Sequence, residues 1–270
     1  MREPVGRSGR RDWLWMAVGC GWMSRAARSA LVVSGLFRAA EIHHLVLTVG
    51  ELERSGEFYR RLLGAGAIER NERSLILGFE RNYLGLRRGE RPGMDHFSIA
   101  IDGFESQAVS AKLMDAGHRP ALKEPDVLVV TDPDGIQVGL CSATHWVCAA
   151  AHSGGKDSLF RGIDVNHVAL RVAEIGPSRD FYQKLFGLEV ASQSSGSCFL
   201  SLGGNFLALF RGQPAGQMDH YCISVEGYTA DAATAKLTKE GHRVRRTANR
   251  IYFPDPDGLT VQLSEADHGP

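Results

Sequence analysis

Two histidines in the second half of the chain stand at matching places in matching segments. His167 opens the apolar segment Val168–Val172, and His220 opens a second one at Tyr221–Val225. Alternate residues of a β-strand share one face, and Gln262 occupies such a position on a third expected strand near the C-terminus. Two imidazoles and one oxygen donor on three neighbouring strands leave half of a metal's coordination sphere open. The sequence therefore predicts a metal site that accepts a substrate with two vicinal oxygens.

The chain repeats these segments. Ile42-His43-His44-Leu45 returns as Val165-Asn166-His167-Val168, and Met94-Asp95-His96-Phe97 returns as Met218-Asp219-His220-Tyr221. Asp132-Pro133-Asp134-Gly135 returns as Asp255-Pro256-Asp257-Gly258 at nearly the same interval. Pro in the second position and Gly in the fourth form a type I turn that Asp caps, so we interpret these acids as structural and not as metal ligands.

Each copy divides again into two units. After each of the four histidine strands comes an apolar pattern with helical spacing, and three short strands follow each helix. The expected strands of the second copy are 189–193, 198–202, 206–210, 243–246, 250–253 and 260–263. This pattern predicts an α+β fold of four βαβββ modules. One module cannot bury its sheet face alone, so we expect two pairs, each curled into a half-closed barrel.

Composition and charge limit the remaining possibilities. The net charge is zero and the body of the chain has no basic run, which argues against nucleic acid or a charged membrane surface as a partner. We expect a leader over residues 1–40, a first domain over 41–142, a linker over 143–162 and a second domain over 163–265. The leader carries Arg10-Arg11-Asp12-Trp13-Leu14, which resembles a twin-arginine export motif. Export is therefore the alternative to a cytoplasmic protein with an unstructured leader.

Over residues 41–265 the chain resembles the vicinal oxygen chelate superfamily, which includes glyoxalase I, fosfomycin- and bleomycin-resistance proteins and extradiol dioxygenases. The resemblance lies in the His-Val-x-Leu-x-Val strand, the Ser-x-x-Phe-Tyr helix that ends in Leu-Phe-Gly, and the Asp-Pro-Asp-Gly hairpin. Four modules in one chain are similar to the extradiol dioxygenases. Their iron lies in the C-terminal pair, bound by the first-strand histidine of each module and a glutamate on the last strand.

The resemblance implies His167 and His220 as metal ligands and Fe(II) or Mn(II) as the ion. Tyr252 matches a tyrosine of the extradiol signature and would orient a substrate oxygen. Gln262 stands where the family has glutamate, which removes a negative charge from the site and predicts weaker metal binding. The signature's upstream histidine is also missing at its spacing, because His242 lies slightly too far away.

The first half departs further from the family pattern. His44 and His96 are retained, but Gly139 occupies the carboxylate position and Val129 the tyrosine position. Glycine offers no side-chain donor, so the resemblance implies a degenerate, mainly structural pair of modules, and a second metal site in this half is the less favoured alternative.

Three functions stay open at this point. The first is a metal-dependent, extradiol-dioxygenase-like enzyme whose small substrate, such as an aromatic diol, chelates the ion. The second is a glyoxalase-like lyase or isomerase, which needs a base that the expected strand 206–210 does not supply. The third is a protein that binds a small molecule without a metal. Each of these three functions is compatible with a homo-oligomer.

Overall fold

The computed structural model describes residues 34–143 and 157–270, and these form four βαβββ modules in succession. The elements of the first two modules are β1 (Ala39–Val49), α1 (Leu52–Leu63), β2 (Gly66–Arg70), β3 (Ser74–Gly78), β4 (Tyr83–Arg88), β5 (Gly93–Ile101), α2 (Ser106–Asp115), β6 (Ala121–Glu124), β7 (Val127–Thr131) and β8 (Gln137–Ser142).

The second half repeats this order. Its elements are β9 (Gly162–Val172), α3 (Ile175–Phe186), β10 (Glu189–Gln193), β11 (Ser197–Leu202), β12 (Asn205–Arg211), β13 (Gln217–Val225), α4 (Ala230–Lys239), β14 (Arg245–Thr247), β15 (Arg250–Pro254) and β16 (Thr260–Ser264). The six strands expected from the sequence in this half therefore all form, with ends shifted by at most two residues.

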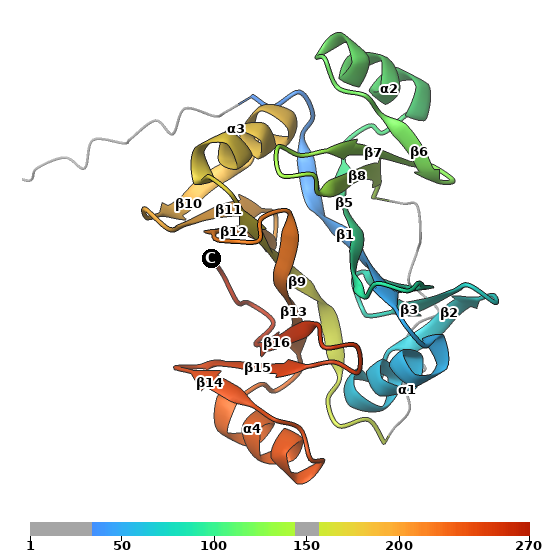
Figure 1. The fold of residues 1–270 in the computed structure, drawn as a ribbon, viewed down its shortest axis with the longest axis vertical. Helices are drawn as coiled ribbons and strands as arrows, with labels where there is room; N and C mark the ends of the chain where they lie inside the picture. The colour runs from blue at the N-terminus through green and yellow to red at the C-terminus, as the bar shows by residue number, and fades with distance from the viewer. Residues whose placement is uncertain (1–33, 144–156) are drawn as a thin grey trace, which may run out of the picture. The chain divides into compact units, whose positions relative to one another are not determined.

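Each half makes one eight-stranded sheet with the first strands of its two modules at the centre (Figure 1). The orders are β2-β3-β4-β1-β5-β8-β7-β6 and β10-β11-β12-β9-β13-β16-β15-β14. The central pairs β1/β5 and β9/β13 are antiparallel, while the last strand of each half runs parallel to its neighbour β5 or β13. The predicted α+β fold of four paired modules is confirmed, and this topology places the histidine strands side by side.

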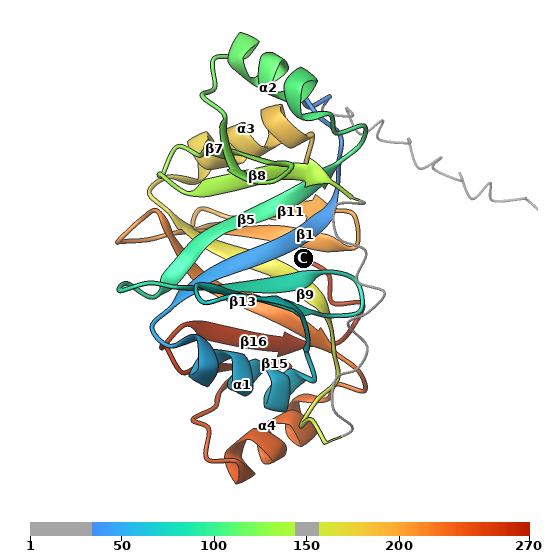
Figure 2. The same ribbon diagram turned by 90° about the vertical axis from the view of Figure 1, so that its right-hand side faces the viewer.

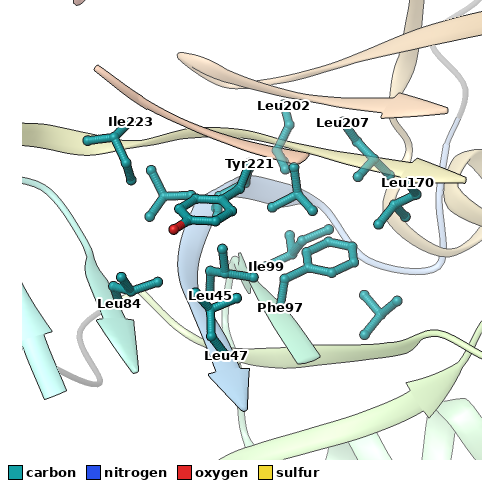
Figure 3. Packing of buried hydrophobic residues seen from close by; sticks show 14 of the residues in the cluster. Leu45, Leu47, Leu84, Phe97, Ile99, Leu170, Leu202, Leu207, Tyr221 and Ile223 are labelled. Carbon is teal, nitrogen blue, oxygen red and sulfur yellow. The ribbon is translucent and has the colours of Figure 1, made fainter. Parts of the chain in front are cut away.

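The two sheets share one apolar core. Alternate residues of the central strands, such as Leu45 and Leu47 in the first sheet and Leu170 and Ile223 in the second, belong to the same buried cluster (Figure 3). The residues that alternate with them along the strands, including His44 and His167, point to the opposite face of their sheets. The period-2 pattern of each strand thus separates a packing face from a face that carries the histidines.

Reciprocal contacts between a helix and a hairpin join the two halves (Figure 2). Tyr59 of α1 donates to Asp255 Oδ2 in the hairpin of the second half at 2.5 Å, and its hydroxyl lies 2.5 Å from that of Tyr221. Conversely, Tyr182 of α3 donates to Asp132 Oδ2 at 2.9 Å. Asp255 Oδ1 also accepts backbone N–H groups within its own turn, so the structural interpretation of the Asp-Pro-Asp-Gly hairpins is correct.

Much of the expected leader and linker lies outside the described residues, including the arginine pair of the export-like motif. Near the leader's end, Phe37 is buried and its backbone N–H donates to Leu185 O at 2.9 Å, two residues before β1 begins. Within 34–143 and 157–270, every helix is too short and too polar to traverse a lipid bilayer.

Candidate metal centre

The structure brings His167 and His220 together on the histidine-bearing face of the second sheet. Strands β9 and β13 are neighbours, with His220 opposite Ala169 and His167 opposite Cys222. The Nε2 atoms of the two imidazoles lie 3.4 Å apart, and both side chains are buried. Two ligands bound to one ion at about 2.1 Å lie roughly 3.0 to 3.4 Å apart for bond angles between square and tetrahedral. The separation therefore fits a pair of ligands to a single ion.

The outer nitrogen of each imidazole is held by its preceding residue. His220 Nδ1 lies 2.8 Å from Asp219 Oδ1, and His167 Nδ1 lies 2.9 Å from Asn166 Oδ1. Asn166 donates through its Nδ2 to the backbone carbonyl of His268 at 3.2 Å, which fixes Oδ1 toward His167. A carboxylate or amide oxygen only accepts, so both Nδ1 atoms carry a proton, and in a neutral ring this leaves the Nε2 lone pair available to a cation.

When both rings are neutral, their Nε2 lone pairs face each other 3.4 Å apart, and a positive charge between them stabilises this arrangement. A shared proton is a poor occupant, because burial lowers the pKa of His167 well below its usual value, and the neighbouring His220 lowers it further. A divalent cation satisfies both lone pairs without protonating either ring. The donor set thus fits a metal ion better than it fits an ordinary hydrogen bond.

Gln262 lies in the same row of residues across the sheet. On β16 it stands opposite Cys222 of β13 and Tyr252 of β15, and its carboxamide is close to the His167 ring. The side chain is buried, yet its Nε2 has no hydrogen-bond partner within the described part of the chain. An unsatisfied buried amide costs about 1 to 3 kcal/mol, so the pocket lacks a polar group that a bound metal with its water or substrate would supply.

Aromatic rings enclose the histidine pair. Phe206 stacks on the His167 ring with centroids 4.1 Å apart, and Tyr252 meets the His220 ring edge-on at 5.3 Å. Phe199 and Phe210 extend this wall. The Arg245 guanidinium lies over the Tyr252 ring, 4.1 Å from its centroid. The environment of the two ligands is therefore apolar on one side and cationic beyond Tyr252.

His268, in the C-terminal tail, was not predicted as a site residue. Its ring centroid lies 5.7 Å from that of His167 and 5.9 Å from that of Phe206, so the tail folds back against the histidine pair. The orienting roles of Asn166 and Asp219 were also missed, although both residues directly precede a predicted ligand. That adjacency was a usable signal, whereas nothing in the tail's sequence indicates where it lies.

In the first half, a neighbouring side chain fills the space beside the position equivalent to Gln262. Gly139 pairs with Ser98 and Val129, and a Cβ at residue 139 would lie only 1.9 Å from Ser98 Oγ. The Ser98 side chain thus fills the space into which a ligand at that position would project. A carboxylate could take the family's usual place in this half only if the Ser98 side chain moved aside.

Comparisons with known proteins agree with this architecture. The family model of the Glyoxalase/Bleomycin resistance protein/Dioxygenase superfamily matches residues 41–122 and 164–263. Catechol-2,3-dioxygenase of Bacillus subtilis (strain 168) is 21% identical over 277 residues, covering 83% of this chain and 96% of the relative.

Solved structures show the same fold. Homoprotocatechuate 2,3-dioxygenase from Arthrobacter globiformis superposes with a TM-score of 0.71 at 20% identity, covering 84% of this chain and 79% of the other. The Mn(II)-bound glyoxalase from Novosphingobium aromaticivorans superposes with a TM-score of 0.70 at 18% identity, covering 86% and 84%.

Proposed function

The chain belongs to the Glyoxalase/Bleomycin resistance protein/Dioxygenase superfamily, and from that premise we propose that its second half holds the metal centre of an extradiol-dioxygenase-like enzyme. The observation that carries the proposal is the buried pair of Nε2 lone pairs, 3.4 Å apart, on His167 and His220. The names of the relatives support the same class of reaction, since both a catechol and a homoprotocatechuate dioxygenase are among them.

The proposed ligands are His167, His220 and the carboxamide oxygen of Gln262, and the proposed ion is Fe(II) or Mn(II). Such an ion acts as a Lewis acid that binds two vicinal oxygens of a substrate. Asp219 and Asn166 keep the two imidazoles in the tautomer that ligates, which is how outer hydrogen bonds usually tune such sites. Because Gln262 is neutral, we expect weaker metal binding than a glutamate would give.

An aromatic diol is the proposed substrate. The ring of such a compound matches the apolar wall of Phe199, Phe206 and Phe210 beside the histidines. Burial raises the pKa of the Tyr252 hydroxyl, so it stays protonated near neutral pH and can donate a hydrogen bond to a substrate oxygen. These residues bind and orient the substrate while the aromatic wall limits the access of water.

A lyase or isomerase reaction is the weaker candidate. The likeness to a Mn(II)-bound glyoxalase favours it, but proton abstraction from carbon needs a base beside the ion. Strand β12, which adjoins β9, directs Phe206, Ala208 and Phe210 to the site. A dioxygenase-like reaction does not need a base on this strand.

The test is metal content followed by oxygen consumption. The protein is purified without oxygen, loaded with Fe(II) or Mn(II), and supplied with a panel of catechols. We expect oxygen uptake with at least one catechol, and the loss of one equivalent of metal in His167→Ala and His220→Ala. His118→Ala serves as the control, because His118 contacts Phe181 on the surface of α3 and not the site.

Three results would overturn the proposal. Metal content that is unchanged in both ligand variants would show that His167 and His220 do not bind the ion. Exchange of a substrate carbon-bound proton without oxygen uptake would select the lyase reaction. Catechol binding that a chelator does not weaken, with no turnover, would make the protein a metal-independent binder.

A further inference from the structure

The first half contains a second histidine pair with the same geometry. His44 and His96 lie on the neighbouring strands β1 and β5, with their Nε2 atoms 3.2 Å apart and both side chains fully buried. His96 Nδ1 lies 2.8 Å from Asp95 Oδ2, and that carboxylate is also held by Lys123 at 3.1 Å. The separation again falls within the roughly 3.0 to 3.4 Å expected for two ligands of one ion. Loss of the residue 139 side chain has therefore not displaced the imidazoles.

A carboxylate reaches this pair from a strand that the family pattern does not use. Glu124 ends β6, at the edge of the first sheet, and its carboxylate and the two imidazoles place their ligand atoms within 4.8 Å of one another. Its side chain is 19% exposed, and Arg87 donates to its Oε1 at 2.7 Å. A carboxylate offers about four lone-pair sites, so one arginine contact leaves others open to a cation.

We propose that His44, His96 and Glu124 form a second site for a divalent transition metal. Two histidines and one carboxylate are the facial ligand set of many Fe(II), Mn(II) and Zn(II) sites. The first half thus keeps a complete ligand set by taking its carboxylate from β6, while the second half has a carboxamide in place of the glutamate. This site is independent of the function proposed above, since it shares no residue with it.

A cavity adjoins the carboxylate of this site. Glu124 and Arg87 line a cavity of about 300 Å³ together with residues of β3 and β4, while both histidines are fully buried. The neighbouring group of His43, His44 and Cys141 is a poorer choice, because the buried Cys141 thiol keeps its proton and donates to Ile99 O at 3.9 Å.

Metal stoichiometry distinguishes the two sites. The full-length protein, freed of metal by a chelator, is titrated with Co(II), and binding is followed by the visible absorption of the ion. We expect two equivalents in the wild type, one in Glu124→Leu, one in His220→Ala, and none in the double variant. Removing the carboxylate should weaken the first-half site by at least about 100-fold, since even residues outside the ligand shell contribute 10- to 100-fold.

Glu124→Leu keeps a side chain of similar size but has no ligand atom, and thermal unfolding shows whether the variant is folded. His96→Ala is the second variant, and it should also remove one equivalent. If Glu124→Leu and His96→Ala both bind as much Co(II), as tightly, as the wild type, the first-half site does not exist. That result leaves the second-half centre standing. The converse result, one equivalent abolished by Glu124→Leu and unaffected by His220→Ala, supports this inference and refutes the proposed function.

Discussion

Replacing Asp219 with alanine removes the group that orients His220. The Asp219 carboxylate accepts from His220 Nδ1 at 2.8 Å and from Arg171 at 2.6 Å. The hydrogen bond from His220 and the ion pair with Arg171 lower the pKa of Asp219 to about 2, so the group is a charged acceptor at neutral pH. Without it, the His220 ring is free to rotate or to carry its proton on Nε2, which blocks coordination.

The size of the effect follows from that one bond. A hydrogen bond to a charged group contributes about 1.5 to 3 kcal/mol, and every 1.4 kcal/mol changes an affinity about tenfold. Asp219 is a third exposed, and water screens part of the interaction. We therefore expect affinity for Mn(II) or Zn(II) to fall by about tenfold, at the lower end of the range typical for residues behind a metal ligand.

Competition with a chromophoric chelator measures this affinity, on a Glu124→Leu background so that an ion in the first half does not contribute. The matched control is Asp180→Ala, because Asp180 also accepts from an arginine, Arg179, but touches no histidine. An unchanged dissociation constant in Asp219→Ala, with thermal stability equal to that of the control, would refute the role assigned to His220.

Two further substitutions test the site and the fold. Gln262→Glu should raise the affinity for Mn(II) by at least about tenfold, because it restores a charged oxygen donor. Calorimetric titration checks this, and an unchanged affinity would mean that residue 262 does not touch the ion. Tyr59→Phe should lower the free energy of unfolding by about 2 to 4 kcal/mol, since buried Asp255 and Tyr221 each lose a partner. Tyr182→Phe should lower the free energy of unfolding by less, about 1 to 3 kcal/mol, because only Asp132 loses a hydrogen-bond partner. Urea unfolding that shows a larger loss in Tyr182→Phe than in Tyr59→Phe would contradict this.

The modules and the histidine pairs could be predicted because their signals are local or repeated. Short apolar segments separated by Ser/Gly turns located β10, β11 and β12. The internal repeat placed His167 and His220 on equivalent strands. Equivalent first strands of paired modules become neighbours in the sheet, and this brings the two rings together.

Other features depend on contacts that no sequence period encodes. Glu124 reaches His44 and His96 only because the sheet curls and brings its edge strand β6 toward its centre. His268 follows the last strand without any apolar pattern, and a backbone contact with Asn166 decides where it lies. The bonds of Tyr59 and Tyr182 connect opposite halves, so the helical spacing of the segments that contain them could not identify their partners.

Crystals soaked in Mn(II) would show whether His167, His220 and Gln262 bind one cation. Data collected near the manganese absorption edge should show an anomalous density peak about 2 Å from both Nε2 atoms and from the Gln262 carboxamide oxygen. A map at saturating Mn(II) without a peak between these three side chains would contradict the account.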